Sequence, residues 1–239
     1  MRYKGVVFDK DGTLIDFHAT WLPVYRFSAL AVSNNDQQLA DELLSQHGYD
    51  LETDRIIGGS LLAAGNNREI GIAWSKHLPG IENEAQIEAI CTRLNHLFQQ
   101  QGSLHSTPVN GLQTTLRELK QAGLKLGVAT SDSYQGILSS LQSFDVISVF
   151  DFLCGYDSGH GVKPDPGMVM AFCDEFSLEP AEVIVVGDNR HDIEMGKNAD
   201  AGLCVGVLTG ASNRGELEEI ADIVLDDISG LGGLVLHQT

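Results

Sequence analysis

Apolar runs of strand length alternate with helical patterns through most of this chain, which restricts it to folds in which strands and helices take turns. The runs lie at residues 3–8, 124–129, 149–153, 183–186, 203–208 and 223–225. The helical patterns between them lie at residues 112–121, 134–141, 167–176 and 191–198. Most runs are apolar on both faces, as strands buried between two helical layers are. We therefore expect an α/β fold built on a doubly wound, Rossmann-like parallel sheet.

Residues 17–106 interrupt this alternation, because they contain no clear strand. The segment AQIEAICTRLNHLFQQQ (85–101) has its apolar residues at helical spacing and predicts an amphipathic helix. Two further helices are expected at residues 23–32 and 36–47. The sequence therefore predicts two domains, an α/β core made of residues 1–16 and 107–239 and an inserted all-helical cap domain made of residues 17–106.

The charge of the chain excludes some classes of partner. The formal net charge is -18, from 15 basic and 33 acidic residues, and such a field repels nucleic acid and anionic membrane surfaces. A negatively charged substrate would therefore need a local positive site. Four cysteines are scattered without a C-x-x-C pair and indicate reduced thiols. No apolar run is long enough to span a bilayer, and the first strand begins too early to leave room for a signal peptide, so we expect a cytoplasmic protein. We also expect a monomer or a homodimer.

Two aspartates, Asp9 and Asp11, follow the first predicted strand in the sequence VVFDKDGTLID (6–16). Binding sites in open parallel sheets form at the carboxyl ends of strands. In an extended backbone, alternation places both carboxylates on one side of the chain and Lys10 on the other. A solvated turn rich in Asp and Gly is the competing interpretation. A calcium loop of the EF-hand type is excluded, because the positions reserved for glycine and glutamate hold leucine and threonine.

Three later segments place polar groups at predicted strand ends. LKLGVATSD predicts a strand that ends in Thr130, whose hydroxyl can bind phosphoryl oxygens together with the backbone amide of Ser131; a serine here can equally cap the next helix. GVKPDP places Lys163 before a proline, which favours an extended backbone; a solvated loop lysine is the alternative. VIVVGDNRHD brings Asp188 to a strand end and Asp192 one helical turn later, where an acidic residue also suits a helix N-terminus. Their order on successive strand ends favours one shared site.

These motifs together resemble the haloacid dehalogenase (HAD) superfamily of phosphohydrolases, in its phosphoglycolate-phosphatase-like branch. The matching residues are Asp9, Asp11, Gly12 and Thr13 of D-x-D-G-T, then Thr130, then Lys163, then Gly187, Asp188 and Asp192 of G-D-x-x-x-D. The insert lies where such families carry a helical cap. Lys10, where leucine or methionine is commoner, and Phe17, where serine is common, depart from the pattern.

The resemblance implies Mg²⁺-dependent hydrolysis of a small phosphate monoester, by default 2-phosphoglycolate, through an aspartyl-phosphate. In this scheme Asp9 is the nucleophile, and Asp11 protonates the leaving alkoxide and then deprotonates water. The implied metal-site residues are Asp9, Asp188, Asp11 through its backbone carbonyl, and Asp192 through water or by orienting Lys163. The implied phosphoryl-binding residues are Thr130, Ser131 and Lys163.

Other interpretations stay open. Within the insert, His18, Arg55 and Arg68 are candidates to contact the leaving group, although side chains of this kind are more often simply solvated. A phosphosugar mutase of the same superfamily would also need the aspartate pair, and a catalytically silent binding protein could keep the fold. A dehalogenase is disfavoured, because those enzymes need no magnesium and lack the acid and base that Asp11 would provide. Phosphonate hydrolysis would need a Schiff-base lysine, for which Lys76 is the candidate.

Overall fold

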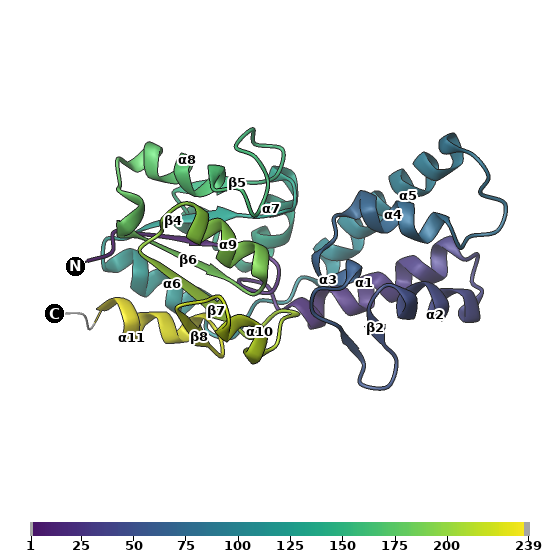
Figure 1. The fold of residues 1–239 in the computed structure, drawn as a ribbon, viewed down its shortest axis with the longest axis horizontal. Helices are drawn as coiled ribbons and strands as arrows, with labels where there is room; N and C mark the ends of the chain where they lie inside the picture. The colour runs from purple at the N-terminus through teal and green to yellow at the C-terminus, as the bar shows by residue number, and fades with distance from the viewer. Residues whose placement is uncertain (1, 237–239) are drawn as a thin grey trace. The chain divides into compact units, whose positions relative to one another are not determined.

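Six parallel strands form one sheet in the order β5-β4-β1-β6-β7-β8 (Figure 1). The structure is a computed structural model that describes residues 2–236. The strands are β1 (Gly5–Phe8), β4 (Lys125–Ala129), β5 (Phe152–Cys154), β6 (Val183–Gly187), β7 (Leu203–Val207) and β8 (Ile223–Leu225). β1 is central and pairs with β4 on one side and β6 on the other. This topology confirms the predicted doubly wound parallel sheet.

Helices cover both faces of the sheet, which explains why the strands are apolar throughout. Val6 and Phe8 of β1 pack in one buried cluster and Val7 packs in the other, as alternation along a strand requires. The helices of the first face are α6 (Leu112–Gln121), α7 (Tyr134–Leu141) and α11 (Leu231–Leu236). Those of the second face are α8 (Gly167–Phe176), α9 (Arg190–Asn198) and α10 (Arg214–Glu218).

The strand expected at residues 149–153 is shifted toward the C-terminus. Ile147–Val149 forms a 3₁₀ turn, and β5 begins at Phe152. Asp151 accounts for the shift, because its carboxylate accepts a hydrogen bond from the backbone N of Leu126 at 2.9 Å. At Leu126 of β4, a side-chain oxygen therefore accepts the hydrogen bond that a backbone carbonyl of the neighbouring strand would otherwise accept.

Residues His18–Ser106 form a second compact unit, whereas the first unit comprises the chain up to Phe17 and from Thr107 onward. The helices here are α1 (Phe17–Val32), α2 (Gln37–Gln46), α3 (Leu61–Ala64), α4 (Asn67–Ser75) and α5 (Glu84–His105). A two-residue antiparallel pair, β2 (Tyr49–Asp50) with β3 (Arg55–Ile56), adds to the helices that the sequence predicts. α1 begins well before the expected start near Pro23, which lies inside it.

The close packing of α4 on α5 depends on a glycine. A Cβ atom at Gly71 would lie 2.8 Å from the Sγ of Cys91, so any larger residue would push the two helices apart. Trp74, which is fully buried, packs edge-on against Phe98 with ring centroids 6.2 Å apart. These contacts give the second unit its own core.

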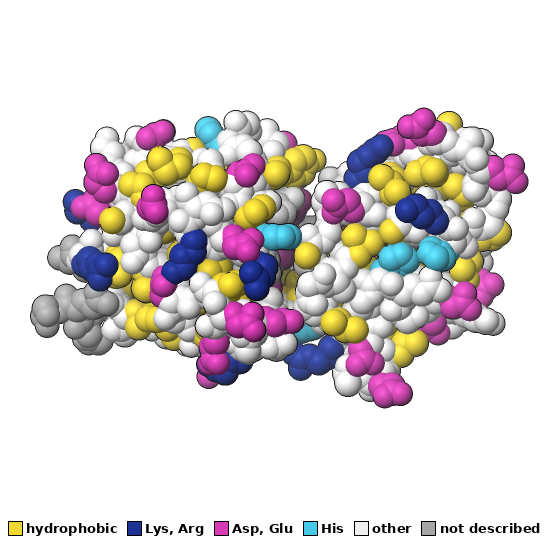
Figure 2. Space-filling model, viewed as in Figure 1, with side chains coloured by type: hydrophobic (Ala, Val, Ile, Leu, Met, Phe, Trp, Pro, Cys, Tyr) yellow, Lys and Arg dark blue, Asp and Glu magenta, His cyan; other side chains and the backbone are white. Residues whose placement is uncertain are grey.

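Charged side chains of both signs are spread over the visible face of the protein (Figure 2). Lys10 and Lys163 do not belong to this surface, because their side chains are 1% and 2% exposed. Among the described residues, no helix combines the length and the apolar character that crossing a membrane requires.

Candidate active site

Asp9 directly follows the central strand β1. Its backbone N donates to the carbonyl of Val186 at 2.8 Å, which continues the pairing with β6 past the end of β1. Its Oδ1 accepts from Nζ of Lys163 at 2.5 Å, and its Oδ2 is buried without a hydrogen-bond partner among the described residues. Burial raises the pKa of Asp9 to about 7; Lys163 opposes this rise and Asp192 adds to it. Asp9 therefore offers one buried oxygen that the protein leaves available.

Lys163 joins two carboxylates, one directly after β1 and one in the first turn of α9. Its Nζ lies 2.5 Å from Asp9 and 2.6 Å from Asp192, and its side chain is 2% exposed. Burial by itself would lower the pKa of Lys163, but Asp192 and Asp9 outweigh it and raise that pKa above its ordinary value. Lys163 is therefore held as a buried cation beside the free oxygen of Asp9, in contrast to a solvated loop lysine.

The carboxylate of Asp192 accepts hydrogen bonds from the backbone at the start of α9 and also from Lys163. Its Oδ2 accepts from the backbone N of Asp188 at 3.1 Å and of Asn189 at 3.2 Å, while its Oδ1 contacts Lys163. The side chain of Asn189 in return accepts from the backbone N of Asp192, which completes a capping box at the helix start. Both oxygens of Asp192 are therefore engaged, so its geometry suits holding Lys163 in place.

Asp9, Asp188 and Asp192 each present one carboxylate oxygen within 4.8 Å of the others, and all three are buried. Burial raises the pKa of Asp188 well above its ordinary value, and Asp192 and Asp9 add to this rise. Space for the cluster is provided by Gly12, whose φ is +91° and where a Cβ would lie 2.5 Å from Cγ of Asp188. Three buried carboxylates against one lysine form a set of hard oxygen ligands that fits a divalent cation such as Mg²⁺.

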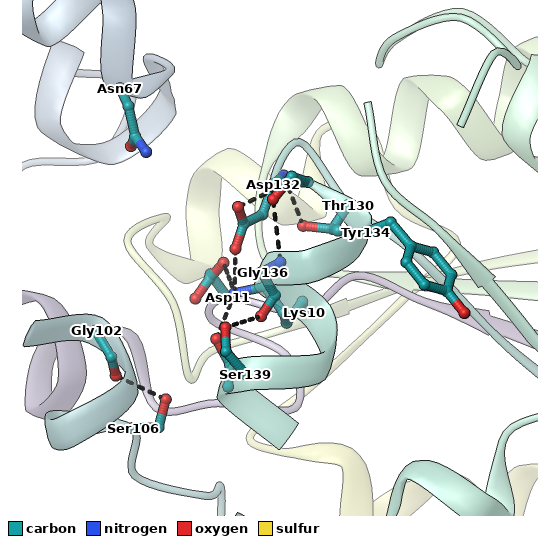
Figure 3. A network of polar contacts seen from close by, with 12 residues as sticks. Lys10, Asp11, Asn67, Gly102, Ser106, Thr130, Asp132, Tyr134, Gly136 and Ser139 are labelled. Carbon is teal, nitrogen blue, oxygen red and sulfur yellow. Dashed lines mark hydrogen bonds and ion pairs between the residues drawn. The ribbon is translucent and has the colours of Figure 1, made fainter. Parts of the chain in front are cut away.

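The expectation that Lys10 and the aspartate pair lie on opposite sides of the chain is wrong. The backbone turns directly after Asp9, because Leu14 N and Ile15 N both donate to the carbonyl of Lys10, at 2.9 and 3.0 Å. Alternation holds only in an extended segment. Nζ of Lys10 lies 2.6 Å from Oδ2 of Asp11 (Figure 3). The buried group of three carboxylates does not include Asp11.

Thr130 and Ser131 lie where the sequence predicts, directly after β4. Thr130 is 2% exposed, and its Oγ1 accepts from the backbone N of Asp132 at 3.1 Å. Ser131 is exposed, and the residue that caps α7 is Ser133, which accepts from Gly136 N at 3.0 Å. Ser131 is therefore not committed to a helix cap.

The candidates of the insert lie in the second unit. His18 is near the start of α1, Arg55 is exposed in β3, and Arg68 forms an exposed ion pair with Glu88 at 2.5 Å. Their part in substrate binding stays a prediction.

Residues 6–205 match the family described as haloacid dehalogenase-like hydrolases. The chain belongs to this family. The predicted resemblance to HAD hydrolases of the phosphoglycolate-phosphatase-like branch is thereby confirmed, as is the prediction that the chain is an enzyme.

Relatives of this HAD chain span nearly its whole length. A phosphoglycolate phosphatase of Pasteurella multocida is 30% identical over 230 residues, which cover 95% of this chain and 96% of the relative. The pyrophosphatase PpaX of Bacillus cereus (strain B4264) is 34% identical over 205 residues, which cover 83% of this chain and 81% of the relative. The crystal structure of a predicted phosphoglycolate phosphatase from Haemophilus somnus has the same fold, with a TM-score of 0.76, 20% identity and 98% of each chain covered.

Two features of this HAD site escaped the sequence prediction. Asp132 contacts Lys10 at 3.1 Å, and Ala211 N donates to Oδ2 of Asp188 at 3.1 Å. Ala211 follows the apolar run 203–208, so the rule that strand ends carry the site would have found it. For Lys10 the only indication was its departure from the family pattern.

Proposed function

We propose that this HAD chain is a phosphoric monoester hydrolase acting on a small phosphate ester, with 2-phosphoglycolate as the first candidate. The observation that carries the proposal is the buried contact of Lys163 with Asp9, beside an Asp9 oxygen that accepts no hydrogen bond from the described residues. A nucleophile needs such an available atom, and a phosphoryl group needs the adjacent cation. Relatives named phosphoglycolate phosphatase support the choice of ester.

The proposed reaction has two displacements at phosphorus. The free oxygen of Asp9 forms a bond to phosphorus while the bond to the ester oxygen breaks, and Asp11 gives that oxygen a proton. Water then attacks the phosphorus of the aspartyl-phosphate, and Asp11 takes the proton of the water. Inorganic phosphate leaves and Asp9 is restored. Lys163, Thr130 and Ser131 bind the phosphoryl oxygens through both steps.

Electrostatics argues that one lysine is insufficient for this reaction. Two unit charges 4 Å apart interact by about 4 kcal/mol at an effective dielectric constant near 20, so a carboxylate approaching a phosphate dianion meets a repulsion that Lys163 offsets only in part. Asp9 and Asp188, with the backbone carbonyl of Asp11, would hold Mg²⁺. The ion would supply the missing positive charge to the phosphoryl oxygens. Asp192, whose oxygens are engaged, would act through Lys163 or through a bound water.

Residues 17–106, which include the whole second unit, are proposed to form a cap domain that selects the leaving group. Lids of this kind exclude water and complete a site when they close. His18, Arg55 and Arg68 are the proposed contacts for an acidic leaving group. The ion pair between Arg68 and Glu88 is exposed to solvent, where such pairs contribute little, so a substrate carboxylate could displace it.

Hydrolysis by the purified protein should require Mg²⁺ and should release inorganic phosphate from one member of an ester panel. The panel contains 2-phosphoglycolate, sugar phosphates and nucleotides, each assayed with Mg²⁺ and with a chelator. Asp188→Asn removes an anionic ligand, so the Mg²⁺ concentration for half-maximal rate should rise by about 10-fold or more. Asp226→Asn, at an exposed aspartate, should leave it unchanged.

Three outcomes of the panel would count against the proposal. Turnover that is equal with Mg²⁺ and with chelator would exclude the metal. Isomerisation of a sugar phosphate that depends on a bisphosphate activator would indicate a mutase. Inactivity on every ester would favour a silent binding protein.

A further inference from the structure

Lys10 is a buried lysine that the proposed reaction does not use. Its side chain is 1% exposed, and its Nζ lies 2.6 Å from Oδ2 of Asp11 and 3.1 Å from Oδ2 of Asp132 (Figure 3). Nζ also donates to Oγ of Ser140 on α7 at 3.4 Å. Lys10 thus connects the turn after β1 to the loop after β4 and to the helix that follows this loop.

The two carboxylates that contact Lys10 lie at the border of the core, with Asp11 and Asp132 side chains 21% and 25% exposed. A buried ion pair contributes little net stability compared with an apolar side chain of similar size, because both ions must be desolvated. Stability alone therefore does not account for a lysine at position 10. Because Lys10 contacts Asp11, the proposed acid and base, we look for its role in the position of that carboxylate.

Asp132 is a fixed anchor for this lysine. Its Oδ1 accepts from the backbone N of Ser133 at 2.7 Å, and its own backbone N donates to Oγ1 of Thr130 at 3.1 Å. A Cβ atom at Gly136 would lie 2.2 Å from Oδ2 of Asp132, so the first turn of α7 has room for this carboxylate only because residue 136 is glycine. With Asp132 held on one side, Lys10 has a defined position from which to hold Asp11 on the other.

We propose that Lys10 is a positioning residue that holds the carboxylate of Asp11 in the place from which it transfers a proton to the leaving group, with Asp132 as its anchor. The inference rests on the proposed function. Lys10 itself does not touch the substrate. It removes rotational freedom from Asp11 and connects Asp11 to the loop that carries Thr130. The group that protonates the leaving oxygen and the group that binds the phosphoryl oxygens are therefore held at fixed positions relative to each other.

Lys10→Met should therefore damage hydrolysis of esters with poor leaving groups selectively. Two probes separate the effects: 2-phosphoglycolate, whose alkoxide needs a proton, and p-nitrophenyl phosphate, whose phenolate does not. kcat/KM reports the first displacement alone if formation of the aspartyl-phosphate is irreversible. We expect kcat/KM to fall by about 10-fold to 100-fold for the alkyl ester and by less than about 3-fold for the aryl ester. In an Asp11→Asn background the same change should add no selective loss.

Lys120→Met is the control, since it removes a lysine that pairs with Asp151 in the same unit, away from the strand ends that carry the site. It should leave the ratio of the two kcat/KM values unchanged. If Lys10→Met does not fold, Asp132→Asn replaces it, because it keeps Lys10 and Asp11 but removes the anchor, and the same selective loss is expected. Equal losses on both esters, no loss, or a gain on the alkyl ester would overturn the role of Lys10. If the panel identifies another alkyl ester, that ester replaces 2-phosphoglycolate as the first probe. A wild-type protein that is inactive on every ester of the panel would refute the proposed function itself, and the inference with it.

Discussion

Asp9→Asn is expected to lower turnover by roughly 10⁴-fold or more while the protein stays folded. An amide oxygen cannot form the acyl phosphate that a carboxylate forms, so the first displacement is lost. The fold should persist because Asn keeps the shape of the side chain and can still accept a hydrogen bond from Lys163. Since burial raises the pKa of Asp9 to about 7, removing its charge should leave thermal stability in chelator unchanged or raised.

Steady-state hydrolysis of the ester found in the panel measures the first part of this prediction, and thermal unfolding measures the second. Asp200→Asn is the control, because Asp200 is exposed and has a φ of 57°, which asparagine tolerates. It should keep wild-type turnover. Substantial hydrolysis by folded Asp9→Asn would contradict the assignment of Asp9 as the nucleophile.

Lys163→Met is expected to lower both activity and stability. The phosphoryl group loses a preorganised cation, which should reduce kcat by about 100-fold to 1,000-fold. Asp9 and Asp192 lose their shared partner in a buried place, and breaking a buried ion pair in this way destabilises by about 3 to 5 kcal/mol. Urea unfolding in chelator measures the second effect.

The destabilisation by Lys163→Met should grow with pH. Without the lysine, the folded-state pKa of Asp9 rises further above its unfolded value. The free energy of unfolding then falls as the pH rises from the unfolded pKa to the folded pKa, and this fall continues to a higher pH in the variant than in the wild type. The difference from wild type should therefore be larger near pH 8 than near pH 5. Lys197→Met, which removes an exposed ion pair with Asp222, should change stability by less than about 1 kcal/mol. A Lys163→Met protein as stable as this control would show that the lysine does not compensate buried charge.

The sheet and the convergence of its strand ends could be predicted because both follow from local pattern. Runs apolar on both faces require two helical layers, and parallel strands bring their carboxyl ends to one edge. Asp9, Lys163 and Asp188 therefore meet although most of the chain separates them. Only the order of motifs along the chain was needed for this step.

The surroundings of Lys10 could not be predicted in the same way. The alternation rule requires an extended backbone, and the turn that ends it is made by hydrogen bonds from Leu14 and Ile15 to a single carbonyl. The partner Asp132 lies more than a hundred residues away in the sequence and reaches Lys10 only through the pairing of β1 with β4. The start of β5 likewise depends on where the side chain of Asp151 binds.

The most direct test of the account is to identify the atom that carries the phosphoryl group during turnover. The substrate, labelled in its phosphoryl group, is mixed rapidly with enzyme and Mg²⁺, quenched in acid, and digested for mass spectrometry. The account predicts a labelled acyl phosphate on Asp9 that forms and decays at rates compatible with kcat. A burst of product with the label on another residue, or full turnover with Asp9 never labelled at any time, would contradict it.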